Sequence, residues 1–156
     1  MARYAENTQV PSDKSRAEIE RTLGRYGASG FMYGWQNGYA VVAFEMYQRR
    51  IRFDLPMPDR NAPEFTKTET GRERSAAQAE KAYEQAVRQR WRALHLVIKA
   101  KLEAVESGIT EFQEEFLAHI VLPNGYTVGR WMLPQVDEAY ESGEMPALLP
   151  APGGKD

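Results

Sequence analysis

One long amphipathic helix is the feature that most constrains what this chain can fold into. The stretch from Ser75 to Ser107 opens with Ser75 and has Gln78 three residues later. This is the spacing of a capping box, in which each side chain bonds a free backbone N–H. Gly108 follows, and glycine takes the left-handed conformation at a helix end without steric penalty. The sequence therefore predicts a single helix over residues 75–107.

Apolar side chains recur on one side of this predicted helix. At 100° per residue they occupy about one third of the circumference, the periodicity of a surface that faces a core. We expect this side to pack on the rest of the domain, through Ala76, Ala79, Tyr83, Ala86, Val87, Leu94, Val97, Ile98 and Val105.

Cations form a narrow line on the opposite side of the predicted helix. At 1.5 Å per residue the line is roughly 35 to 40 Å long, enough to follow several phosphates. The alternative is a solvated helix face, because Lys and Arg are good helix formers and their i,i+4 pairs contribute only a few tenths of a kcal/mol. The line consists of Arg74, Lys81, Arg88, Arg92 and Lys99, with His95 at its margin.

Two cations, Arg90 and Lys101, interrupt the apolar stripe. Either their long side chains reach past their neighbours to water, or the helix projects beyond its own core there and meets a partner.

The residues from Phe31 to Leu55 predict a three-stranded antiparallel sheet. Asn37-Gly38 is a strong two-residue turn, and a second reversal is expected at Tyr47-Gln48. Pairing across the two turns places the same residues on one face, which agrees in both registers. The inward set is Phe31, Tyr33, Trp35, Val42, Phe44, Ile51, Phe53 and Leu55.

The other face of this sheet is less polar than a freely solvated face should be. It carries Met32, Tyr39 and Val41 beside Arg50 and Arg52. Either a terminal helix covers it, or it is a binding surface.

The remaining segments complete an α+β fold, which we expect to be one domain over residues 12–144. An arm (residues 1–11) precedes a helix capped by Ser12, and residues 56–71 read as a loop. A second capping box at Thr110 and Gln113 predicts a helix to about Ile120, and a last short helix follows Pro134 and stops at Gly143. Residues 145–156 are expected to be a flexible tail.

Charge is segregated along the chain. Residues 1–101 hold 18 Lys and Arg against 12 Asp and Glu, a balance of +6, whereas residues 102–154 hold only Arg130 against nine acids, a balance of −8. A basic body with an acidic final third can bind a polyanion through one face. Alternatively the acidic part masks the basic part, within one protomer or between protomers.

Catalysis has little support in the sequence. There is no cysteine, and no glycine-rich phosphate loop follows a predicted strand. Glu115 and His119 have the i,i+4 spacing of two metal ligands, but without a third ligand a chance pair is the better interpretation. We expect no enzyme activity, no cofactor, no metal and no membrane segment, and the cysteine-free composition suits a reducing cytoplasm.

Two resemblances add to these expectations. The order helix, three antiparallel strands, helix over residues 12 to about 100 is similar to the double-stranded RNA-binding domain, and Arg72, Arg74 and Lys81 could take the phosphate-binding role of its second helix. Separately, residues 14–26 (KSRAEIERTLGRY), 50–60 (RIRFDLPMPDR) and 88–106 (RQRWRALHLVIKAKLEAVE) resemble small uncharacterised proteins encoded by bacteriophages and prophages. That second resemblance implies the cytoplasm of a bacterial host.

Two functions follow from these surfaces. The first is a non-enzymatic nucleic-acid-binding accessory protein that contacts backbone phosphates through Arg74, Lys81, Arg88, Arg92 and Lys99, with Arg50 and Arg52 as helpers. Tyr39, Tyr47 or Trp91 could offer stacking surfaces to bases. The second is an oligomeric adaptor or inhibitor, in the phage setting a counter-defence protein, that binds a protein partner through Met32, Tyr39, Val41, Arg90 and Lys101. The sequence leaves the nucleic-acid type, the partner and the oligomeric state open.

Overall fold

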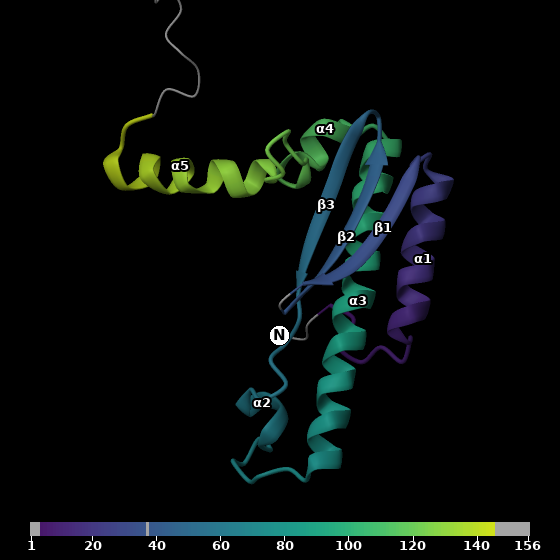
Figure 1. Cartoon of the computed structure of the whole chain (residues 1–156), viewed down its shortest axis with the longest axis vertical. Helices are drawn as coiled ribbons and strands as arrows, with labels where there is room; N and C mark the ends of the chain where they lie inside the picture. Colours follow the sequence, from purple (N-terminus) through teal and green to yellow (C-terminus); the bar gives the residue numbers. More distant parts are fainter. Residues whose placement is uncertain (1–3, 37, 146–156) are drawn as a thin grey trace, which may run out of the picture.

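The computed structural model describes residues 4–36 and 38–145 and confirms the α+β fold. One layer is a three-stranded antiparallel sheet in the order β1-β2-β3, formed by β1 (Gly30–Gln36), β2 (Tyr39–Met46) and β3 (Arg49–Pro56). The second layer consists of α1 (Ser12–Arg25) and the long α3 (Ala76–Glu106), which lie side by side on one face of the sheet (Figure 1). We call the face that they cover the inner face.

Both predicted strand registers are confirmed. Tyr33 pairs with Val42 across the first turn, and Val42 pairs with Phe53 across the second. Tyr47 and Gln48 both have positive φ, at 50° and 61°, as a type I′ turn requires. Of the first turn only Gly38 is among the described residues, and its φ is 80°.

The core lies between the inner face and the two helices. The largest fully buried side chains include Trp91, Phe44 and Phe116, with Ile19 and Leu23 from α1 and Ile98 from α3. Two residues of the predicted inward set lie on the inner face but contribute little to this core, because Trp35 is 74% exposed and Tyr33, edge-on to Trp91 at 6.5 Å, is 47% exposed. Their strand, β1, is an edge strand, and the helix layer does not extend over its final residues.

The long helix forms unbroken, with the predicted capping box at its start: Ser75 Oγ accepts from Gln78 N and Gln78 Oε1 accepts from Ser75 N. Gly108 has a φ of 78° and ends it as expected. The sheet covers only the C-terminal half of α3, and the N-terminal half extends past it (Figure 1). There α2 (Pro63–Thr66), a single turn inside the predicted loop, packs Phe65 edge-on against Tyr83.

The buried arc of α3 differs from the predicted stripe. Its buried residues are Trp91, Leu94, His95, Ile98 and Leu102, whereas Val97 is exposed. At 100° per residue the centre of this arc is rotated by about 70° from the centre of the predicted stripe, toward the line of cations. The cations therefore border the core and do not lie opposite to it.

The C-terminal region departs most from expectation. The predicted helix from Thr110 is two short pieces, α4 (Phe112–Glu115) and the 3-10 turn η1 (Leu117–His119). Thr110 makes no cap, because its hydroxyl bonds Glu115 Oε2 at 3.1 Å. The last helix, α5 (Val128–Ser142), begins before Pro134 and contains it, and ends at Gly143 as predicted. Residues 146–156 of the expected tail lie outside the described residues.

Candidate nucleic-acid interface

A groove between α1 and α3 brings together cations from both helices. Its volume is about 410 Å³, and it is lined by Glu18, Arg21, Thr22, Arg25, His95 and Lys99. Arg21, Arg25 and Lys99 are exposed on its rim, while Thr22 and His95 are buried at its floor. We call this surface the α1/α3 groove.

A hydrogen-bonded network forms the floor of the α1/α3 groove. Thr22 Oγ1 lies 3.3 Å from His95 Nε2, and a guanidinium nitrogen of Arg92 lies 3.1 Å from His95 Nδ1. An arginine can only donate, so Nδ1 accepts, and the imidazole proton is on Nε2, which donates to Thr22. Burial first, and the charge of Arg92 second, lower the pKa of His95. The imidazole is therefore neutral at neutral pH.

Glu18 is the only acid among the described residues that line the α1/α3 groove, and it is already neutralised. Its Oε2 accepts from Arg92 at 2.5 Å, between side chains that are each about one quarter exposed. The same oxygen lies 3.4 Å from His95 Nδ1, a contact that would be an ion pair only with a protonated imidazole. Because that ring is neutral, Arg92 is the partner of Glu18. The three rim cations thus face solvent over a floor without net negative charge.

A second nearby acid, Glu103, is also engaged. Tyr26, the residue after α1, donates its hydroxyl proton to Glu103 Oε1 at 2.5 Å. This bond raises the pKa of Tyr26, because the carboxylate stabilises the protonated phenol. The contact ties the end of α1 to α3 and draws Glu103 toward the tyrosine.

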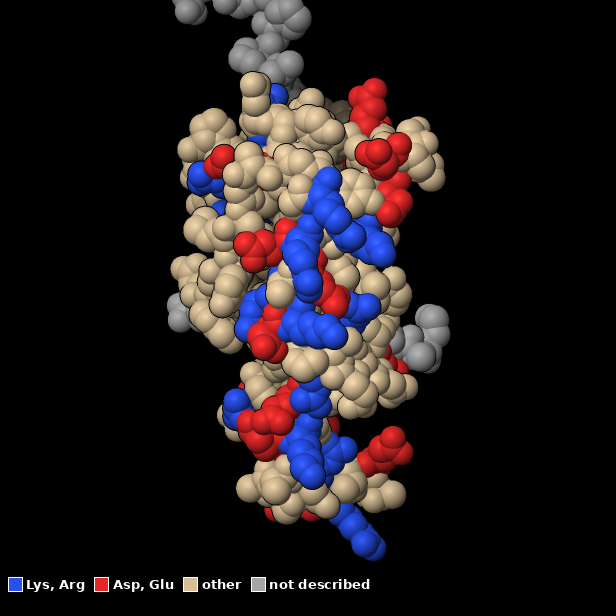
Figure 2. Space-filling view, turned by 90° about the vertical axis from the view of Figure 1, so that its right-hand side faces the viewer, with Lys and Arg blue, Asp and Glu red and all other residues tan. Residues whose placement is uncertain are grey.

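The other cations of the predicted line continue along α3 away from the α1/α3 groove. Arg88 donates twice to Gln85 on its own helix, at 2.7 and 3.2 Å, and Lys81 is exposed. Arg74, just before the helix, folds back onto the carbonyl oxygens of Glu64 and Phe65. Figure 2 shows the result as a band of Lys and Arg side chains down this side of the molecule, with Asp and Glu side chains among them.

The N-terminal arm lies beside this band. Gln85 donates to the carbonyl oxygens of Glu6 and Thr8, and Gln89 donates to that of Tyr4 at 2.6 Å. These two glutamines therefore hold the arm against α3.

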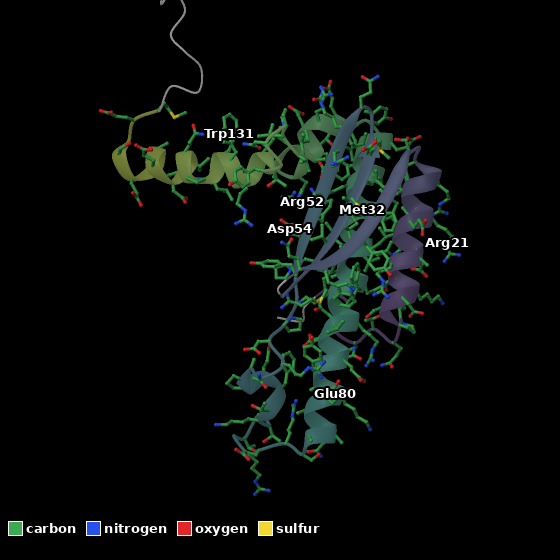
Figure 3. All side chains as sticks on the ribbon, in the orientation of Figure 1. Arg21, Met32, Arg52, Asp54, Glu80 and Trp131 are labelled. Atoms are coloured by element: carbon green, nitrogen blue, oxygen red, sulfur yellow. The ribbon has the colours of Figure 1, made fainter. Side chains whose placement is uncertain are left out.

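Arg50 and Arg52 lie on the outer face of the sheet and are not brought together with the cation line. Arg50 pairs with Glu45 at 3.1 Å, and Arg52 pairs with Asp54 at 3.2 Å while donating to the carbonyl of Gly125 at 2.9 Å. Figure 3 shows Arg52 and Asp54 on the side of the sheet toward α5, and Arg21 on the far side of α1. A ligand in the α1/α3 groove does not reach them.

The acids of α5 do not mask the α1/α3 groove within one protomer. α5 runs crosswise to α3 and extends away from the body on the side opposite to α1 (Figure 1). Its acids Asp137, Glu138 and Glu141 are all exposed.

The five residues predicted to bind a protein partner have different surroundings. Met32 and Tyr39 are exposed and Val41 is partly buried on the outer face. Arg90 instead donates to the carbonyl of Pro56 at 3.0 Å, and Lys101 bonds both the carbonyl and the carboxylate of Glu115. Contacts within the chain account for these two cations.

The stacking surfaces expected from the sequence are also changed. Trp91 is only 1% exposed, with its ring edge-on to Tyr33 at 6.5 Å, so the expectation that it stacks on bases is wrong. Arg16 lies over both rings, at 5.0 and 5.1 Å from their centroids. Tyr47 packs against Phe112 at 4.9 Å although its side chain is largely exposed.

Arg21 and Arg25 were not among the cations that the sequence pattern indicated as site residues. A signal was present, because Glu18, Arg21, Thr22 and Arg25 recur at i, i+3, i+4 and i+7 and so share one side of α1. Which helix this side meets could not be read from that spacing.

The Glu115 and His119 pair has a structural role. Glu115 bonds Lys101 at 3.2 Å, and His119 stacks on Phe53 at 3.9 Å, where burial lowers its pKa. Over residues 4–36 and 38–145, no three metal-binding side chains come together. Among the helices of the same residues, none has the length and apolarity to cross a lipid bilayer.

No protein-family model, curated protein or solved structure matches this chain. The function must therefore be inferred from the geometry of the site.

Proposed function

We propose that this protein is a non-enzymatic nucleic-acid-binding protein that contacts backbone phosphates along the α1/α3 groove and the adjoining part of α3. The observation that carries this proposal is the meeting of Arg21, Arg25 and Lys99 on one rim, above a carboxylate that Arg92 neutralises. Arg88 and Lys81 extend the same path, and Lys81 and Lys99 are roughly 27 Å apart along the helix axis. That length corresponds to about eight base pairs of duplex.

A solvated helix face explains scattered cations but not their convergence from two helices. Like charges on neighbouring helices repel, and an anion bound between them would offset that repulsion. Here Glu18, the acid that lines the groove, is paired with Arg92, and Glu103 accepts a hydrogen bond from Tyr26. A phosphate backbone would supply the missing negative charge, and the resemblance to phage-encoded proteins fits an accessory role of this kind.

The test is fluorescence anisotropy with single-stranded and duplex DNA and RNA probes over a salt series. If three to five of these cations contact phosphates, log K falls against log salt with a slope of about −3 to −4.5 on duplex DNA. Affinity then drops roughly 60-fold to 500-fold between 50 and 200 mM salt. The probe that binds most tightly at fixed salt identifies the nucleic-acid type.

Paired charge reversals locate the interface. The double variant Arg21→Glu, Lys99→Glu is expected to lose at least about tenfold in affinity and to flatten the salt slope by about 2. The matched control, Arg49→Glu with Lys67→Glu, changes the net charge equally at exposed sites away from the α1/α3 groove and should retain most binding. Equal loss in the two variants would mean that total charge alone drives binding.

The alternative function, a protein-binding adaptor or inhibitor, is supported by a different observation. The outer face of the sheet is not covered by any helix among the described residues, and Met32 and Tyr39 are exposed on it. Failure of every probe to bind at low salt would favour the adaptor.

A further inference from the structure

The last helix lacks a partner for its apolar side. α5, which is described throughout, has no buried residue. At 100° per residue Met132, Leu133, Val136, Ala139 and Tyr140 share one side of the helix, and Leu133 is 60% and Tyr140 88% exposed. An isolated helix of this length is marginal in water, because helices in proteins gain most of their stability from packing one face. A surface that covers this side is therefore expected.

Within the protomer α5 is held mainly near its beginning. Thr127 caps it by accepting from Arg130 N, and Gly129 lies so close to Ala118 of η1 that an added Cβ would be 3.0 Å from the Ala118 carbonyl oxygen. The helix then extends away from the sheet and α3 (Figure 1). Its orientation is thus fixed at one end while its apolar side remains open.

The corner between α5 and the sheet contains a wide groove. Its volume is about 930 Å³, and it is bordered by Tyr39, Val41, Arg52 and Asp54 on the sheet and by Tyr126 and Trp131 at the start of α5. Figure 3 shows Trp131 on α5 and Arg52 and Asp54 on the adjacent side of the sheet. We call this surface the corner groove.

We propose that the corner groove binds α5 of a second copy of this chain, so that two copies form a two-fold symmetric dimer. Each L-shaped protomer offers both halves of the contact, an unpartnered apolar helix and an unpartnered sheet face. A two-fold axis places α5 of each protomer on the sheet face of the other, which makes an isologous interface. The two elements also match in length, since α5 is about 22 Å long and the eight residues of β2 span about 26 Å.

Charge argues against two α5 helices packing on each other. α5 carries Asp137, Glu138 and Glu141 against one base, Arg130. On the outer face of the sheet Arg50 pairs with Glu45 and Arg52 pairs with Asp54, so these four charges cancel. The sheet of a second copy therefore accepts the acidic helix without the repulsion that another α5 would exert.

The available area is sufficient for a stable dimer. Eight large side chains are exposed around the two halves of the contact: Met32, Tyr39, Tyr126, Trp131, Leu133, Val136, Tyr140 and Met145. Taking about 200 Å² as the full surface of a side chain of this size, their exposed fractions leave on the order of 900 Å² open to solvent. A standard interface buries about 800 Å² per partner.

The dimer does not depend on the proposed nucleic-acid binding. The α1/α3 grooves lie on the opposite side of the sheet and stay open in it, so the dimer would present two phosphate-binding surfaces.

Light scattering coupled to size-exclusion chromatography tests the assembly. The wild-type chain is expected at twice its mass of 17.8 kDa. Leu133→Glu on the helix and, separately, Met32→Glu on the sheet should each weaken dimerisation by about 100-fold or more, because each substitution occurs twice. Both side chains are exposed in the protomer, so circular dichroism should show a folded chain. The matched control Trp35→Glu changes an exposed aromatic side chain outside the contact and should remain dimeric.

Cross-linking distinguishes a second copy from a helix that folds back on its own sheet. The chain has no cysteine, so Tyr140→Cys and Met32→Cys can be made in separate chains, mixed and oxidised. Pairing between copies gives a disulfide-linked species of twice the chain mass. A wild-type monomer at micromolar concentration, or a dimer indifferent to both glutamate variants, would overturn the proposal.

Discussion

Replacing Trp91 with alanine should remove a large part of the stability of this fold. The side chain is 1% exposed and packs between the sheet and α1. A buried Trp→Ala change costs about 3 to 5 kcal/mol through lost transfer energy and the remaining cavity. The edge-on contact with Tyr33 and the cation contact with Arg16 add roughly 1 kcal/mol, so we expect a loss of about 4 to 6 kcal/mol.

The measurement is urea unfolding followed by circular dichroism, which does not depend on the tryptophan removed. The matched control is Trp35→Ala, a change of the same size at a side chain that is 74% exposed, and it should shift stability by about 0.5 kcal/mol or less. For a chain of this size, Trp91→Ala should lower Tm by about 10 to 15 °C. A loss below about 2 kcal/mol, or an equal loss in the control, would refute the placement of Trp91 in the core. That placement would also be refuted if Trp91→Phe lowered nucleic-acid affinity without lowering stability, because Trp91 would then contact the ligand.

Three further predictions concern the floor of the α1/α3 groove and the ends of helices. Burial lowers the folded-state pKa of His95 and His119, so stability is complete above the unfolded pKa of about 6.5 and falls as the pH drops below it. Each histidine contributes at most about 1.4 kcal/mol per pH unit, and a His95→Gln chain should lose less between about pH 7.5 and pH 5.5 in urea titrations. Ser75→Ala should cost about 1 kcal/mol in thermal unfolding by removing the α3 cap, unlike Ser107→Ala at the other end. Gly129→Ala should destabilise the attachment of α5 and speed amide exchange there, although alanine is the better helix former; a more stable chain would contradict the contact with Ala118.

The sheet could be predicted residue by residue because two independent signals agreed. The turns at Gly38 and at Tyr47-Gln48 each fix a register, and a slip of one residue in either would turn Val42 and Phe44 to the other face. The extent of the covering layer could not be predicted in the same way. Alternation assigns Trp35 to the inner face, but only the positions of α1 and α3 determine that the edge strand is left uncovered there.

The buried side of α3 was misplaced for a related reason. The predicted stripe gave every apolar residue the same weight. The small alanines of the projecting N-terminal half therefore set its direction, and Trp91 and Leu102 fell outside it. Only the C-terminal half meets the sheet, and there the large side chains decide which arc is buried. The resulting rotation brings Arg92 and Lys99 beside α1. The groove is formed by residues of both helices, so the pattern of either helix alone could not predict it.

Local signals failed where tertiary contacts compete with them. The Thr110 and Gln113 spacing resembles a capping box, but the hydroxyl of Thr110 bonds Glu115, which is itself held by Lys101. Pro134 reads as a helix start, yet α5 already begins at Val128 because Thr127 caps it. Proline there removes the hydrogen bond to the carbonyl of Arg130, a cost that an exposed helix can reduce by hydrating the carbonyl.

The net charge of this chain is near zero, but a basic surface and an acidic surface lie on opposite sides of the sheet. The inner-face helices carry Arg21, Arg25, Lys81, Arg88 and Lys99, while Asp137, Glu138 and Glu141 lie on a helix that leaves the opposite side. Because charge interactions between exposed groups are largely screened beyond about 10 Å, each surface acts on its own surroundings and not on the other. The same separation lets α5 pack on the sheet of a second copy without closing either α1/α3 groove. A total charge of −2 is thus compatible with a face that binds a polyanion.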